Sequence, residues 1–174
     1  TNITLPARLP FNVTRVVFVN GHFRADLSDD MKADKGIVID SLKPHLAHGP
    51  VKAHYGQVAP IGDRLFTAMN AAAPTDGLII LATKGTKTSK PIHVLHITNG
   101  DQQLIQPRDL FMLHEGAAVE VIIEHIGTDA SSSLVNSIRE SVIGEGASLT
   151  IHLLQNQSNC PAHIGLDGVT IGAK

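Results

Sequence analysis

The sequence predicts a mainly β protein, in which a small α/β amino-terminal part precedes a stacked-strand core of the parallel β-helix or solenoid type. Hydrophobic residues make up 43% of the chain, yet tryptophan is absent and tyrosine occurs once, so the core must be aliphatic. Stacked strands suit such a core, because β-branched side chains pack in rows on a pleated surface. Beyond Gly77, apolar runs alternate with turns and no helical period is present.

The first segment, Arg15–Phe23, predicts a hairpin. Its apolar run is followed by Asn20-Gly21, a pair typical of tight turns between strands. The polar stretch Asp26–Gly36 predicts a loop, and Gly36–Asp40 predicts a short strand. Ser41 is suited to cap a short helix at Leu42–Ala47, which Gly49-Pro50 is expected to end.

Asp63–Ala73 has the clearest helical spacing in the chain, and Pro74 should end it. One face of this helix is expected to carry Leu65, Phe66, Met69 and Ala72. The pattern changes after the helix. We therefore divide the chain into residues 1–75, a small α/β amino-terminal region, and residues 76–174, the beginning of a β-helix core.

An internal repeat is the main indication of a solenoid. His114–Gly127 and Gly144–Gln157 align at an offset of 30 positions (144 minus 114), and both contain Glu-Gly-Ala. A unit made only of strands and turns buries its apolar face by stacking on its neighbours. We therefore expect Glu115 and Glu145 at equivalent corners. The apolar positions that should stack are Val119, Val121 and Ile123 on Leu149, Ile151 and Leu153.

Two fainter copies flank this pair. Leu78–Leu81, Lys84-Gly85 and Ile92–Ile97 form a third copy, and Val169–Ala173 opens a fourth. The alternative fold is an antiparallel sandwich or jelly roll, in which two hairpins resemble each other by chance.

Composition restricts the possible partners. The formal net charge is −2 and no basic run is present, which disfavours nucleic-acid binding. No apolar stretch approaches the roughly 20 residues needed to cross a bilayer, and no signal peptide is recognisable. The single cysteine, Cys160, cannot form an internal disulfide and fits a reducing compartment. We expect a cytoplasmic protein without a membrane or nucleic-acid partner.

Both ends of the sequence suggest a piece of a longer protein. The sequence starts at Thr1 without methionine, and Val169–Lys174 reads as a strand and an unfinished turn. A last rung without a cover would offer strand edges and apolar side chains for pairing. We therefore expect self-association near Val142–Lys174, most simply as a homodimer.

Ten histidines suggest a metal site, but their spacing does not support one. His93 and His96 are three residues apart, which places them on opposite faces of a strand. Cys160 and His163, with His152 near in sequence, could ligate zinc or iron, but a convincing third ligand is missing. The remaining loop or short-helix histidines are expected to be solvated: His22, His45, His48 and His54.

No catalytic motif is present. Glu124-His125 and Arg139-Glu140 could be read as acid–base pairs, but neighbours on a strand face opposite sides and one of each pair should meet solvent. Neither a nucleophile elbow nor a phosphate-binding loop occurs. We therefore predict no catalytic residue, no cofactor-binding residue and no metal ligand.

Three stretches resemble the SufB/SufD family of iron–sulfur cluster assembly proteins, and SufD in particular. They are Val16–Asp29, Asp76–Thr98 and His114–His125, of which the last contains the Glu-Gly-Ala corner. The extended cysteine-bearing pattern associated with SufB is missing. The resemblance implies a small α/β part followed by a β-helix. Because the family's functional positions lie further along the chain, none is carried over to this sequence.

The resemblance also implies a function. It suggests a non-catalytic scaffold subunit that pairs with a SufB-like subunit and a SufC-like ATPase, in a complex that handles iron or an iron–sulfur cluster. No cofactor is expected on this segment itself. The alternative is a β-helix or cupin-like enzyme whose metal site uses some of the histidines.

Overall fold

A computed structural model describes residues 3, 5–32, 34–62, 64–128, 132–157 and 162–172. The strands and helices follow in this order: β1 (Thr14–Val19), β2 (His22–Phe23), the 3-10 turn η1 (Ala25–Leu27), β3 (Ile37–Ser41), the 3-10 turn η2 (Lys43–His45), α1 (Gly49–His54), α2 (Leu65–Ala72), β4 (Leu78–Ala82), β5 (Ile92–Asn99), β6 (Leu104–Ile105), β7 (Arg108–Leu113), β8 (Ala118–Thr128), β9 (Leu134–Ile143), β10 (Ser148–Gln157) and β11 (Ala162–Ile171).

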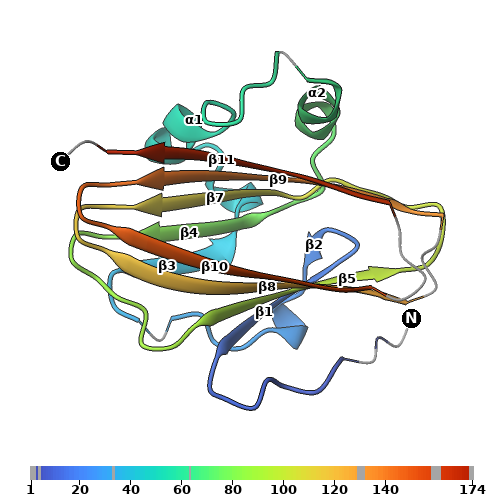
Figure 1. The fold of residues 1–174 in the computed structure, drawn as a ribbon, viewed down its shortest axis with the longest axis horizontal. Helices are drawn as coiled ribbons and strands as arrows, with labels where there is room; N and C mark the ends of the chain where they lie inside the picture. Colours follow the sequence, from blue (N-terminus) through green and yellow to red (C-terminus); the bar gives the residue numbers. More distant parts are fainter. Residues whose placement is uncertain are drawn as a thin grey trace.

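The strands form two sheets, and from β4 onward the chain alternates between them (Figure 1). One sheet has the order β10-β8-β5-β1-β2, and the other has the order β11-β9-β7-β4-β3. The short strand β6 pairs with β9. All neighbours are parallel except the pairs at one end of each sheet, β1 with β2 and β3 with β4. The mainly β fold class is confirmed.

Each turn of the solenoid uses one strand from each sheet. Ile151 of β10 pairs with Val121 of β8, at the predicted offset of 30 (151 minus 121). The fainter upstream copy stacks on the same column, where Ile92 of β5 pairs with Val121. Val169–Ile171 of the fourth copy belong to β11, which pairs with β9 along its whole length, and Ala173 lies outside the described residues. Parallel stacking of successive units confirms the solenoid, because the sandwich alternative requires antiparallel neighbours.

The corners between the two sheets stack as the repeat predicts. Gly85, Gly116 and Gly146 have φ angles of 72°, 66° and 62°, a region that residues with a Cβ seldom adopt. The N–H of Gly85 donates to the carbonyl of Glu115 at 2.9 Å, and that of Gly116 donates to Glu145 at 2.9 Å. The two Glu-Gly-Ala motifs therefore occupy equivalent corners of neighbouring rungs.

The amino-terminal strands extend both sheets. β1 pairs with β5, and β3 pairs with β4, so the predicted strand at residues 36–40 is confirmed. The hairpin is also confirmed, with Asn20 and Gly21 at φ 48° and 75° between β1 and β2. Val16 and Phe18 pack in the same core as the rung residues. The division at residue 75 stays a prediction, although the core is shared across it.

The predicted helix at Leu42–Ala47 is wrong in its bounds. Ser41 belongs to β3, and its hydroxyl donates to the Asp76 carboxylate at 2.9 Å instead of capping a helix. Only the 3-10 turn η2 follows. Gly49 and Pro50 begin α1, where we expected them to end a helix. Proline suits the first turn, because its fixed φ is helical and its missing N–H has no partner there.

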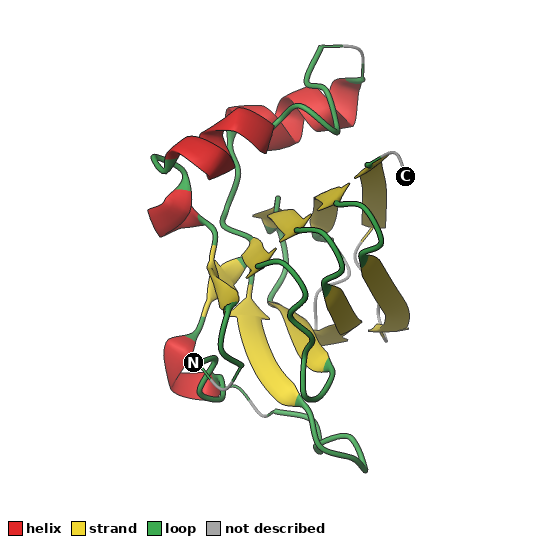
Figure 2. Cartoon of the chain, turned by 90° about the vertical axis from the view of Figure 1, so that its left-hand side faces the viewer, coloured by secondary structure: helices red, strands yellow, loops and turns green. Residues whose placement is uncertain are grey.

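The second helix, α2, is confirmed, but its buried face is not the apolar one. Leu65 is 70% exposed, whereas Thr67 and Asn70 are buried. The Asn70 amide donates to the carbonyls of Pro107 and Asn136 at 3.0 and 2.9 Å. The helix thus covers carbonyls at the start of β7 and β9, which need donors once buried. Both helices lie outside the strands, on one side of the stack (Figures 1 and 2).

Gly77 should not tolerate any side chain. A Cβ at this position would lie 1.7 Å from the carbonyl oxygen of Arg108, which is backbone of the adjacent rung. We expect Gly77→Ala to lower the free energy of unfolding by about 3 kcal/mol or more, since the clash cannot be relieved by a side-chain rotation. Gly49→Ala is the matched control, because nothing lies within 4 Å of its Cβ. Urea denaturation of both variants tests this, and equal midpoints would contradict it.

Candidate functional site

The interior of the solenoid contains a stack of aromatic and imidazole rings. Phe18, His96 and His125 come from β1, β5 and β8, and each packs on the next with ring centroids 5.1 and 4.8 Å apart. His163 of β11 approaches His125 edge-on, at 4.4 Å between centroids. His96 and His125 are register partners, so the stack follows directly from the parallel pairing.

Burial keeps these imidazoles neutral. Loss of solvent, with a smaller contribution from the positive charge of Arg139, lowers the pKa of His96 to about 3. The same loss of solvent lowers the pKa of His125 to about 2, helped by repulsion from its imidazole neighbours. The pKa of His163 is lowered for the same reason. At neutral pH the stack therefore presents uncharged rings to the interior.

A charged ladder crosses the other sheet on its interior side. Asp109, Arg139 and Asp167 are successive register partners in β7, β9 and β11. Arg139 Nη1 donates to Asp167 Oδ1 at 2.7 Å, and its Nε lies 3.8 Å from Asp109 Oδ2. Burial raises the pKa of Asp109 to about 6, against the opposing effect of Arg139. One guanidinium thus connects three rungs.

A cavity of about 580 Å³ opens between β10 and β11. Its polar lining residues include Arg139, Ser141 and Asp167, and most of the remaining lining is aliphatic. Leu153 and Ile171, both on the lining, are 56% and 72% exposed. These two strands are also the edges of their sheets. Exposed edges next to exposed core side chains suit the docking of another strand.

The helical layer is fixed to the outside of the solenoid by a buried ion pair. Arg108 Nε lies 3.0 Å from Glu140 Oε2, and both side chains are fully buried. The Glu140 carboxylate also accepts the N–H groups of Gly56, Val58 and Ala59 at 2.8 to 3.0 Å. The pair therefore anchors the segment that follows α1 to β7 and β9.

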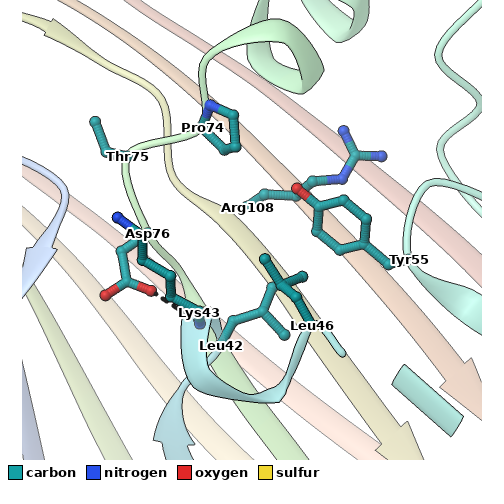
Figure 3. Close-up of a pocket in the computed structure, with 8 residues that line it drawn as sticks. All are labelled: Leu42, Lys43, Leu46, Tyr55, Pro74, Thr75, Asp76 and Arg108. Atoms are coloured by element: carbon teal, nitrogen blue, oxygen red, sulfur yellow. Dashed lines mark hydrogen bonds between the residues drawn. The ribbon is translucent and has the colours of Figure 1, made fainter. Parts of the chain in front are cut away.

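A small cavity beside this anchor offers little room for a ligand (Figure 3). Its volume is about 50 Å³, and Tyr55 and Arg108 line it, with the guanidinium 5.1 Å from the ring centroid. The Asp76 carboxylate at its rim already accepts from the Ser41 hydroxyl and the Lys43 N–H. This space suits one or a few water molecules, which makes it a poor substrate site.

The structure separates the histidines that are adjacent in the sequence. As predicted, His93 and His96 face opposite sides of β5. His93 Nε2 lies 2.9 Å from Glu124 Oε2 on the outer face, and His96 points inward. We missed the pairing of His96 with His125. The repeat of 30 does not reveal it, because the two residues are 29 positions apart (125 minus 96) and a shift of one residue would place Ile126 beside His96, with its side chain on the opposite face.

The histidines near Cys160 do not converge. Cys160 lies outside the described residues. His163 Nε2 contacts the Ser137 hydroxyl at 3.0 Å in the interior, whereas His152 contacts Glu120 at 3.3 Å and is half exposed. In the ranges that the structure describes, no group of three or more His, Cys, Asp or Glu could hold a metal ion. The absence of metal ligands stays a prediction.

One expectation about the charged strand pairs is wrong. Glu124 faces outward and His125 inward, as alternation predicts. Arg139 and Glu140 also face opposite sides, but neither meets solvent, since they are 8% and 0% exposed. The reason is the helical layer, which covers the outer face of β9 where a bare sheet would be solvated.

The buried histidines predict sensitivity to acid. Because the folded pKa values of His96 and His125 lie below the unfolded value near 6.5, the unfolded state binds more protons as pH falls. Below that pH, each of the two histidines lowers the free energy of unfolding by about 1.4 kcal/mol for each pH unit. Asp109 acts in the opposite direction between about pH 4 and 6, since its folded pKa is raised. The net expectation is a loss of stability below pH 6.

Urea unfolding at several pH values between 4 and 7 checks this expectation. His96→Phe keeps a ring in the stack and removes one titrating group, so the pH slope should fall by about 1.4 kcal/mol per unit. Leu65→Phe, at an exposed position without a titrating group, should leave the slope unchanged. An unchanged slope in His96→Phe would contradict the assignment.

The fold defines the class of protein: a parallel β-solenoid with an outer helical layer. Residues 10–94 match the family model described as the SufBD protein N-terminal region. No helix in the described part of the chain is long and apolar enough to cross a membrane.

Three curated relatives share the description iron-sulfur cluster assembly SufBD family protein. Two come from Synechocystis sp., with 27% identity over 91% of this chain and 31% identity over 52%. One from Arabidopsis thaliana, named chloroplastic, is 27% identical over 70% of this chain. The chain is thus similar to the SufB/SufD family, in its family model and in these three relatives. It spans only 38%, 19% and 22% of the lengths of these relatives.

Proposed function

We propose that this chain is part of a scaffold subunit of a SUF-type iron–sulfur cluster assembly complex, of the SufD-like kind. The match of residues 10–94 to the SufBD family model carries the proposal, and the names of the similar proteins concern cluster assembly. The parallel solenoid supports it, because a stack of rungs gives a long, rigid surface on which other subunits can dock.

The proposed role is non-catalytic. In the part of the chain that the structure describes, the charged side chains of the interior contact one another, as Arg139 does with Asp109 and Asp167. We propose a SufB-like subunit and a SufC-like ATPase as partners. Iron or the cluster is then cargo of the complex, with no tightly held cofactor on this segment and a location in the cytoplasm.

Copurification tests the proposal. The parent protein should be expressed with SufB-like and SufC-like subunits and recovered as a stoichiometric complex, and loss of its gene should lower the activity of iron–sulfur enzymes. The protein alone should not hydrolyse ATP. A failure to form the complex, or a hydrolase or lyase activity that depends on one bound metal ion, would favour the alternative of a metal-dependent β-helix enzyme.

We also propose that the chain self-associates through β10 and β11. Both are edge strands, and exposed apolar side chains such as Leu153, Val169 and Ile171 adjoin them. A symmetric dimer would pair these edges and cover the cavity between them. Light scattering over a dilution series should show a concentration-dependent dimer. Leu153→Lys with Ile171→Lys should give a monomer, and a wild-type chain that stays monomeric at high concentration would refute the interface.

A further inference from the structure

Two histidines and an aspartate lie close together near the surface, on β3 and on the segment that joins β3 to α1. His45 is the last residue of η2, and His48 is the residue before α1. Their Nδ1 atoms are 3.3 Å apart, with the rings nearly perpendicular. The other ring nitrogen of His45, Nε2, lies 3.0 Å from Asp40 Oδ2. The sequence predicted that both histidines would simply be solvated.

The separation of the two nitrogens is the one that a metal ion requires. Two imidazole nitrogens at about 2.0–2.1 Å from a tetrahedral ion lie about 3.3–3.4 Å from each other. The two Nδ1 atoms are therefore already at a suitable separation, and each ring needs only to turn so that its lone pair points at the ion instead of along the line between the nitrogens. Zn²⁺ accepts imidazole ligands and this geometry, and water can complete its coordination.

Asp40 determines which nitrogen of His45 is free. An ionised carboxylate only accepts hydrogen bonds, so His45 must carry its proton on Nε2 and leave the Nδ1 lone pair available. This is the carboxylate–histidine arrangement that supports metal ligands in proteins. In the absence of an ion, His48 Nδ1–H donates to His45 Nδ1. Binding requires that His48 move its proton to Nε2 and that both rings turn toward the ion.

The backbone holds the pair in place before any ion arrives. The N–H of His48 donates to the carbonyl of His45 at 2.9 Å, and the N–H of His45 donates to Leu42 at 2.9 Å. Leu42 and Val51, on either side of the pair, are each 3% exposed and pack in one apolar cluster. His48 itself is exposed, which gives an ion access from solvent.

We propose that His45 and His48 form an exchangeable binding site for a first-row divalent ion of the Zn²⁺ type, with Asp40 as a positioning residue. The site is independent of the proposed scaffold function. It provides two protein ligands, so it falls outside the clusters of three or more that the described residues lack. With two ligands and open water positions, we expect a weak and reversible site.

Calorimetric titration of the chelator-treated protein with Zn²⁺ tests the site. We expect saturable binding of one ion per chain, weakened about 10-fold or more in His48→Asn and in Asp40→Asn. Asp40→Asn keeps the Oδ1 oxygen that accepts the Ser41 N–H, so the strand should remain intact. His22→Asn, at another exposed histidine, is the control and should bind as the wild type does.

A second measurement separates loss of the site from loss of the fold. Co²⁺ should give the visible absorption of a tetrahedral ion with nitrogen ligands in the wild type, and lose it in His48→Asn while the circular dichroism is unchanged. The proposal is overturned if wild-type protein shows no saturable binding, or if His48→Asn binds Zn²⁺ as tightly as the wild type.

Discussion

Val121→Asp should abolish cooperative folding of the chain at neutral pH. Val121 is fully buried in the interior of β8, stacked between Ile92 and Ile151 of the neighbouring strands. A carboxylate placed there has no hydrogen-bond donor to compensate the water it loses. We expect a cost of about 4 kcal/mol or more, which is a large part of the stability of a typical domain.

Val38→Asp is the matched control for that substitution. Val38 also lies in a strand, but β3 is the edge of its sheet and the side chain is 40% exposed. The expected cost is about 1 kcal/mol, the span of strand propensity. Far-UV circular dichroism and urea denaturation of both variants test this difference in stability. A folded Val121→Asp variant with the midpoint of Val38→Asp would mean that this column is not the interior of the solenoid.

Glu140→Ala should release the segment that follows α1 from the solenoid. The substitution removes one acceptor from three backbone N–H groups and leaves Arg108 buried without its counter-charge. Breaking a buried pair on one side costs about 3–5 kcal/mol, because the remaining charge stays desolvated. Hydrogen exchange should show lost protection at Gly56, Val58 and Ala59, together with a lower urea midpoint.

Two further variants make this result specific. Glu140→Gln keeps an oxygen that can accept from Val58 and Ala59, so it should cost less than Glu140→Ala while still weakening the bond to Arg108. Glu145→Ala removes an exposed glutamate at a corner, and a change within about 0.5 kcal/mol is expected. Retained protection of the Gly56–Ala59 amides in Glu140→Ala would contradict the anchoring role.

The repeat made most of the solenoid predictable. Parallel stacking places equivalent residues of successive rungs in register, so the offset between the two Glu-Gly-Ala motifs is also the register of β8 with β10. Corner glycines and alternating apolar positions follow from local backbone and side-chain constraints, which act within a few residues. Such constraints can be recognised from a single sequence.

The helical layer was predictable only in part. The spacing of α2 indicated a helix, but its orientation depends on carbonyl groups at the start of β7 and β9 that the Asn70 amide must satisfy. Likewise, Gly49-Pro50 can end one helix or begin the next, and the packing of Val51 decides between these readings. The local sequence pattern of a segment does not indicate which groups from distant segments will be buried against it.

The sequence by itself determined the stacked-strand core, the offset of 30 residues between β8 and β10, and the place of the corners. Only the tertiary structure decided which polar groups contact one another. His96 stacks on His125, and Arg139 pairs with two aspartates. Arg108 pairs with Glu140, and His45 contacts both His48 and Asp40. The physical reason is the distance along the chain over which each kind of interaction acts. Periodicity records the faces of a strand, whereas the pairing of polar side chains depends on distances between rungs and layers that are fixed only when the chain has folded.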